Sequence, residues 1–163
     1  MSAPQPEPPF PPDLADVVPL TLPEPVHRVR SFVSGDPAGD RLRVAYWAHT
    51  PTHEVRARAW FGPDAEGPPG HAHGGSIAAV LDEVMGVAAW YRGHRVVAKT
   101  LAIDFVSPLP LGRDTIVFAD VRSVEGRRVT VEGRIESDGG RVHTRATGVY
   151  VVVDGAMLER FGL

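Results

Sequence analysis

HGGSIAAVLDEVMGVAAWY, residues 73–91, is the stretch that decides the fold. From Ser76 onward it is almost free of polar side chains, apart from Asp82 and Glu83. Ser76 is a suitable N-cap residue and Gly93 can end the helix, so the pattern predicts one helix of roughly four turns. Because such a helix is apolar on nearly every side, we expect it to be buried against a sheet and a second subunit.

The segments around this helix have the pattern of β-strands. Upstream, residues 40–60 alternate apolar and polar side chains on both sides of Thr50-Pro51-Thr52, which predicts a hairpin. Residues 61–75 are rich in glycine and proline, and we expect a loop there. Downstream, we expect four strands in an antiparallel meander, at residues 95–108, 114–124, 127–137 and 141–153, with turns at Gly112, Glu125-Gly126 and Asp138-Gly139-Gly140.

The order of these elements indicates the fold class. One helix without alternating strands and helices favours an α+β protein in which an antiparallel sheet wraps around a long central helix, the hotdog fold. The 163 residues, 43% apolar and 23% charged, fit one globular domain. Nine of the 16 prolines lie between Pro4 and Pro25, so we expect residues 1–25 to be a mobile or extended arm and residues 26–163 to form the domain.

Charge and residue types argue against several kinds of partner. A formal net charge of -3 gives no general attraction to nucleic acid, and no apolar run is long enough to cross a membrane. The sequence has no cysteine and its first residues lack the pattern of a secretory signal, so we expect a cytoplasmic protein. His71 and His73, even with His49 and His53, lack the spacing of a metal-binding motif, and we expect no metal.

The start of the helix is where we expect chemistry. Gly74 and Gly75 let a ligand approach the backbone closely, and the first N–H groups of a helix have no acceptors within it. These features predict an oxyanion site. Asp82 follows Gly75 by seven residues, in an apolar stretch where an unpaired charge is costly to bury. Its presence there indicates a functional role.

These residues resemble the PaaI-like and THEM4-like branch of the hotdog thioesterases, whose motif is HGG followed by an acid at this spacing. The resemblance covers about residues 70–153 and includes DEVMG at 82–86, LAIDF at 101–105, SPLPLG at 107–112 and EGR at 125–127. It implies hydrolysis of acyl-CoA thioesters at the interface of a homodimer, and hotdog dimers often pair again into tetramers. Coenzyme A would enter only as part of the substrate, with no other cofactor.

The resemblance also implies roles for particular residues. Asp82 would be the general base or the nucleophile, and the Gly75 N–H would polarise the thioester carbonyl. Relatives often have Ser or Thr ten residues before the strand-ending proline, and counting back from Pro108 gives Ala98. Thr100 lies two residues further on and, by the period of a strand, is expected to point to the same face and to replace that hydroxyl in part.

Other residues near the motif have several interpretations. His73 is expected either to position the glycine turn by bonding to backbone or to contact the substrate. Glu83 lies about 100° around the helix from Asp82 and can face solvent, contact a second subunit or act as an auxiliary acid, with the contact favoured over chemistry. Turn arginines can meet the phosphates of coenzyme A or simply be solvated. The candidates for substrate contacts are Gly74, Ser76, Glu83, Ala98, Arg127 and Arg128, with Arg113 as a further turn arginine.

Two other functions stay open on this fold. A non-catalytic acyl-CoA binder or sensor would account for the alanine at position 98, although such sensors usually carry an effector domain and the N-terminal arm has no helix-turn-helix pattern. A hydratase or dehydratase would need a histidine and an acid facing one cavity, but the predicted helix carries no histidine and no matching histidine-acid motif is present.

Overall fold

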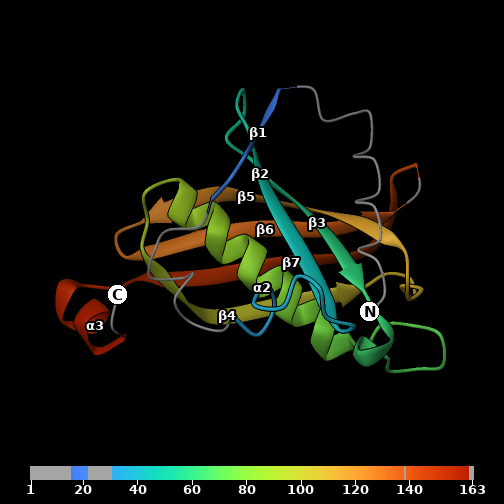
Figure 1. The fold of residues 1–163 in the computed structure, drawn as a ribbon. Helices are drawn as coiled ribbons and strands as arrows, with labels where there is room; N and C mark the ends of the chain where they lie inside the picture. The colour runs from blue at the N-terminus through green and yellow to red at the C-terminus, as the bar shows by residue number, and fades with distance from the viewer. Residues whose placement is uncertain (1–15, 22–30, 138, 162–163) are drawn as a thin grey trace.

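The computed structural model describes residues 16–21, 31–137 and 139–161. Its elements are strands β1 Val17–Pro19, β2 Leu42–His49, β3 Val55–Phe61, β4 Val96–Phe105, β5 Asp114–Glu125, β6 Arg128–Ser137 and β7 Arg141–Val152, the 3-10 helix η1 Pro63–Ala65, and the helices α2 Gly74–Tyr91 and α3 Gly155–Phe161. The seven strands form one antiparallel sheet, and α2 lies along one face of it (Figure 1). The expected hotdog arrangement of a sheet around one long helix is confirmed.

The expected meander of four strands is wrong in one respect. The strand order is β1-β2-β3-β5-β6-β7-β4, so β5, β6 and β7 form a meander while β4 pairs with β7 at the far edge. The other side of β5 is taken by β3, which pairs with it from Val55 to Trp60. Most residues of β4 are exposed, as is typical of an edge strand. The segment between β4 and β5 is therefore a crossover and not a tight turn.

The ends of α2 are set by backbone hydrogen bonds. The N-cap is His73 and not Ser76, because the backbone N–H groups of Ser76 and Ile77 already donate to the His73 carbonyl. At the other end, Gly93 adopts a positive φ of 86°, and the N–H groups of Gly93 and His94 donate to the carbonyls of Trp90 and Ala89. This is a Schellman ending, and the predicted helix end at Gly93 is confirmed.

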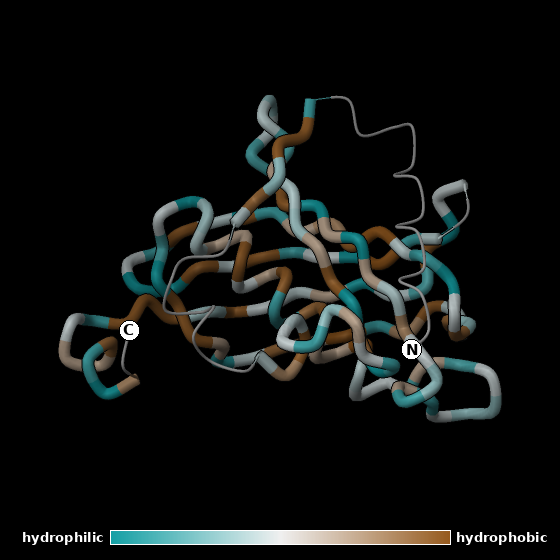
Figure 2. Tube along the Cα trace, in the orientation of Figure 1, coloured by the Kyte–Doolittle hydropathy of each residue, from teal (hydrophilic) through white to brown (hydrophobic). Residues whose placement is uncertain are grey.

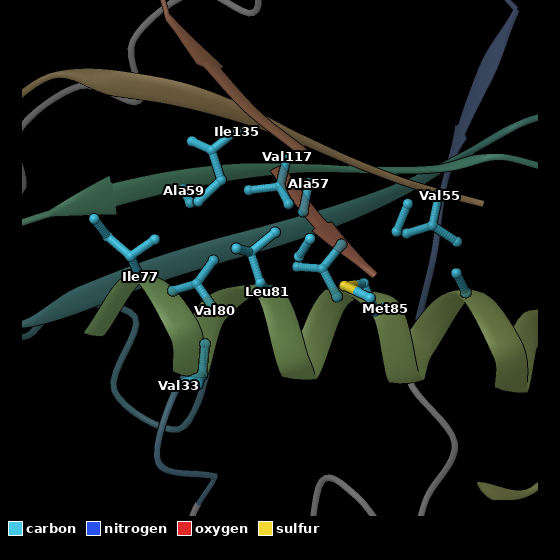
Figure 3. Close-up of a cluster of buried hydrophobic side chains, with 14 of the residues drawn as sticks. Val33, Val55, Ala57, Ala59, Ile77, Val80, Leu81, Met85, Val117 and Ile135 are labelled. Carbon is cyan, nitrogen blue, oxygen red and sulfur yellow. The ribbon is translucent and has the colours of Figure 1, made fainter. Parts of the chain in front are cut away.

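The core lies between α2 and the sheet. Figure 3 shows Ile77, Val80, Leu81 and Met85 on α2 pointing toward strand residues such as Val117 and Ile135. Hydrophobic segments lie mainly along the helix and strands, whereas the turns are more polar (Figure 2). The helix lies close to the sheet at Gly133 and Gly148, where an added Cβ would be 3.0 Å from Met85 Cγ and 2.8 Å from Met85 Cε.

Three short elements were not expected from the sequence. Within the predicted arm, β1 pairs antiparallel with β2, from Val17 opposite His49 to Pro19 opposite Trp47. Arm residues 1–15 and 22–25 lie outside the described part of the chain. The predicted loop at 61–75 contains η1, and α3 follows β7 at the end of the chain. The predicted hairpin of β2 and β3 is confirmed, with Leu42 opposite Phe61.

Candidate functional site

Asp82 borders an open hollow between α2 and the edge strand β4. The hollow measures about 340 Å³. Its lining residues are Ala78, Ala79, Asp82, Ala98, Lys99, Thr100 and Leu101. Because the alanines are small, a substrate chain has room beside the carboxylate. The structure thus brings together Asp82, Ala98 and Thr100, which the sequence had suggested, and adds Lys99.

A buried tyrosine on β7 holds the Asp82 carboxyl group. The Tyr150 hydroxyl donates to Asp82 Oδ1 at 3.1 Å and to the Asp82 carbonyl at 3.0 Å. Burial, together with the negative charge and the accepting oxygen of Asp82, raises the pKa of Tyr150 well above its usual value. The hydroxyl therefore stays protonated and acts as a donor.

The neighbouring acid points to a different set of partners. Glu83 accepts hydrogen bonds from the Tyr46 hydroxyl and, at 2.6 Å, from Ser31 Oγ. Burial and the adjacent Glu83 charge raise the pKa of Tyr46 above its usual value. Glu83 does not line the hollow beside Asp82. Its contacts tie the segment before β2 to the helix, and nothing in this geometry supports the suggested substrate contact.

The predicted oxyanion donor has a partner of its own. The Gly75 N–H donates to His73 Nδ1 at 2.8 Å, so the histidine caps the helix by bonding to backbone. The His73 side chain is exposed. Ser76 Oγ donates to the His73 carbonyl at 2.7 Å. Gly74 lies against the Phe105 ring, since an added Cβ would be 3.3 Å from Phe105 Cζ.

A β-bulge changes the expected direction of Thr100. Ala98 pairs with Tyr150 and Thr100 pairs with Val149, so Lys99 is the extra residue of the bulge. Because Tyr150 and Val149 are neighbours on β7, their side chains point to opposite faces of the sheet. The expectation that Thr100 shares the face of Ala98 is therefore wrong. Ala98 is the one that shares a face with Tyr150.

The candidate arginines do not border this hollow. Arg127 donates to the Val152 carbonyl through Nε and Nη2, at 3.1 and 3.0 Å. Arg128 begins β6 and is exposed, opposite Glu125 in the hairpin. Arg127 therefore closes the end of β7, and Arg128 stays available to solvent.

The crossover after β4 supports the loop that carries His73. Backbone bonds join Ala72 N to Leu109 O and Leu111 N to Gly70 O. The crossover is in turn held by His143, which is 1% exposed. Its Nδ1 lies 2.9 Å from the Pro108 carbonyl and 3.0 Å from Ser107 Oγ, and its Nε2 lies 2.6 Å from Ser137 Oγ.

Removing this imidazole should destabilise the fold. We expect His143→Ala to lower the free energy of unfolding by about 2–4 kcal/mol, because it leaves a cavity and unpaired buried polar groups. Urea unfolding followed by circular dichroism measures the change. His94→Ala, at a partly exposed position, is the control, and equal losses in the two variants would contradict a supporting role for His143.

A larger hollow, of about 490 Å³, lies on the outer face of the sheet. Its lining includes Arg122, Glu132, Arg134 and Arg145, and it contains none of the candidate residues. Several of these charges pair with one another, such as Arg122 Nε with Glu132 Oε2 at 2.7 Å.

In the described ranges, no three or more His, Asp or Glu side chains gather in a way that could hold a metal ion. Nor does any described helix have the length and apolar character needed to cross a membrane.

Comparison with known proteins points to one family. The model of the thioesterase superfamily matches residues 69–144. The acyl-coenzyme A thioesterase THEM4 of Xenopus laevis is 40% identical over 91 residues, which are 55% of this chain and 41% of that protein. A crystal structure of a thioesterase superfamily protein is 31% identical, with a TM-score of 0.62 over 67% of this chain and 53% of the other. A Bacillus halodurans protein crystallised with CoA is 27% identical, with a TM-score of 0.57 over 63% of this chain and 70% of the other.

The residues matched by the family model include the HGG motif and the lining of the hollow, whereas Tyr150 lies beyond them. The chain spans less than half the length of the curated relatives that it matches. The shared part contains the HGG turn, Asp82 and β4 to β6, and so includes the elements around the hollow.

Proposed function

We propose that this chain carries a domain of the thioesterase superfamily and that it hydrolyses acyl-CoA thioesters to the free acid and coenzyme A. The observation that carries the proposal is the Asp82 carboxylate, held by Tyr150 at an open hollow between α2 and β4. The similar THEM4 is named as an acyl-coenzyme A thioesterase, and the similar Bacillus halodurans protein was crystallised with CoA. Both support the substrate class.

The complete site needs two copies of the chain. Gly75 and Asp82 are seven residues apart on one helix, which separates them by ~10 Å along its axis. A thioester carbonyl has to lie about 3 Å from both its hydrogen-bond donor and the attacking group. The Gly75 N–H and Asp82 of one chain therefore cannot serve the same carbonyl. We propose a homodimer in which the helix start of one subunit faces Asp82 of the other.

The edge strand β4 is the surface best suited to join the two copies. It pairs with β7 on one side only, and its other edge presents unpaired backbone groups. A second β4, antiparallel to the first, would continue the sheet through a two-fold axis. Phe105 and Val106, which are 57% and 56% exposed at the end of this strand, would then be covered.

Two chemical routes use the same carboxylate. As a general base, Asp82 takes a proton from water while the water oxygen attacks the thioester carbon and the C–S bond breaks. As a nucleophile, Asp82 attacks that carbon, releases the coenzyme A thiolate and forms an anhydride that water then cleaves. In both routes the negative charge develops on the carbonyl oxygen. The Gly75 N–H would stabilise it, once the His73 ring has turned away.

The test is release of coenzyme A thiol from a panel of acyl-CoAs, from acetyl to palmitoyl with phenylacetyl and benzoyl. Because the chain has no cysteine, a thiol reagent detects coenzyme A without protein background. Saturable turnover of at least one thioester is the expected result, and the rate profile identifies the acyl group. A folded protein that binds coenzyme A but releases no thiol would favour the non-catalytic binder, for which Ala98 is the supporting residue.

We further propose that the protein acts in the cytoplasm, supported by the lack of cysteine. Pairing of dimers into tetramers is also part of the proposal. Gel filtration with light scattering gives the mass in solution, and a monomer at micromolar concentration would contradict the shared site.

A further inference from the structure

The Tyr150 ring lies between β7 and α2, next to Gly148 of the strand and Gly86 of the helix. Tyr150 is 2% exposed, yet its hydroxyl reaches Asp82 beside the open hollow. An added Cβ at Gly148, two residues earlier on the same face of β7, would lie 2.5 Å from Tyr150 Cε2. An added Cβ at Gly86 would lie 3.8 Å from Tyr150 Cε1 on the helix side. The ring therefore has little freedom to move.

The hydroxyl makes two contacts with one residue. It lies 3.0 Å from the Asp82 carbonyl and 3.1 Å from Asp82 Oδ1, so it fixes the side chain relative to the helix backbone. Ala98, which pairs with Tyr150 across the sheet, has no hydroxyl to offer the carboxylate. Among the described residues, Tyr150 is the one whose side-chain hydrogen bond to the Asp82 carboxylate the structure shows.

We propose that Tyr150 is a positioning residue of the hydrolytic site, which binds Asp82 Oδ1 and so presents Oδ2 to the attacking water or the thioester carbon. This inference rests on the proposed thioesterase function. A carboxylate that is already held in its reactive rotamer loses no conformational freedom when the substrate binds. Fixing it therefore raises the rate of the chemical step more than the affinity for substrate. Tyr150 acts through Asp82 and does not touch the substrate.

Tyr46 provides a matched control. It holds Glu83, the next residue of the helix, by the same type of hydrogen bond, but Glu83 does not line the hollow. Tyr150→Phe and Tyr46→Phe each remove one buried hydroxyl from one carboxylate. A general loss of stability would affect both variants, whereas loss of positioning should affect Tyr150→Phe alone.

The first test separates kcat from KM. We expect Tyr150→Phe to lower kcat about 10- to 100-fold with KM changed by less than about twofold, and Tyr46→Phe to keep both. Gly148→Ala, which retains the hydroxyl but displaces its ring, should also lower kcat. A folded Tyr150→Phe enzyme with a kcat within about twofold of the wild type would overturn the proposal.

A second measurement tests the contact without activity. The chain has three tyrosines, so protein labelled with ¹³C at the tyrosine ζ carbon gives three NMR signals, and Tyr150→Phe identifies one of them. That signal should shift in Asp82→Asn, because a charged acceptor becomes neutral, and should stay in place in Glu83→Gln. If the Tyr150 chemical shift is the same in Asp82→Asn as in the wild type, the hydrogen bond between Tyr150 and Asp82 is contradicted. If the wild type cleaves no thioester but the signal responds, the proposed function fails, and with it the catalytic role of Tyr150, while the contact remains as a structural tie.

Discussion

Asp82→Asn is expected to lower kcat by ~10³-fold while the fold and the dimer persist. Asparagine has the shape of aspartate and still offers Oδ1 to the Tyr150 hydroxyl, so the fold should persist. It is a poor base and a poor nucleophile, so neither chemical route remains. Thiol release gives kcat, and calorimetry with coenzyme A checks that binding is retained.

Glu83→Gln is the matched control for this substitution. Glu83 is the adjacent carboxylate on the same helix, and its bonds to Tyr46 and Ser31 turn it away from the hollow. We expect this variant to unfold at a lower temperature but to keep its turnover number. Equal losses of kcat in the two variants would show that a change in α2, and not the chemistry of Asp82, had removed the activity.

Phe105→Asp should convert the protein to a monomer and abolish turnover. The Phe105 ring is 57% exposed at the end of the edge strand and lies against Gly74 at the start of α2. In the proposed dimer a carboxylate there would be buried twice across a two-fold axis, which costs several kcal/mol per interface. Sedimentation equilibrium measures the loss of the dimer, and thiol release measures the loss of activity.

Phe161→Asp is the corresponding control on another surface. Phe161 is 52% exposed on α3, which follows β7 at the Val96 end of β4 and so lies at the opposite end of that strand from Phe105. Its replacement should change neither mass nor activity. A Phe105→Asp protein that remains dimeric yet inactive would place this ring in the substrate path and not at the subunit contact. A dimeric and active variant would contradict the proposed use of this edge.

The local pattern of the sequence predicted the helix and its acid well. An apolar stretch interrupted by Asp82 and Glu83 identified α2, and alternation identified the main strands. Pairing between distant strands has no local signal, so the place of β4 beside β7 was missed. The bulge at Lys99 likewise has no local signal. One inserted residue moves every later side chain of the strand to the opposite face of the sheet, so Thr100 does not share the face of Ala98.

The residues that hold the site were also hidden in the sequence. Tyr150 lies in the apolar run GVYVVV, so its burial is expected to reflect core packing and not a hydrogen bond to a carboxylate. Its hydroxyl was the one available signal, because a buried tyrosine usually finds a hydrogen-bond partner. The N-cap role of His73 has no strong signal in the sequence, because histidine is not a common N-cap residue and the nearby Ser76 is a preferred one.

The most direct test of the thioesterase proposal is a paired steady-state rate. Wild type and Asp82→Asn would be compared on the best acyl-CoA of the panel, at saturating substrate and equal concentrations of folded dimer. The account predicts thiol release by the wild type and a rate lower by ~10³-fold in the variant, with coenzyme A bound equally by both. Equal rates in the two proteins, or no release by a wild-type dimer that binds coenzyme A, would contradict it.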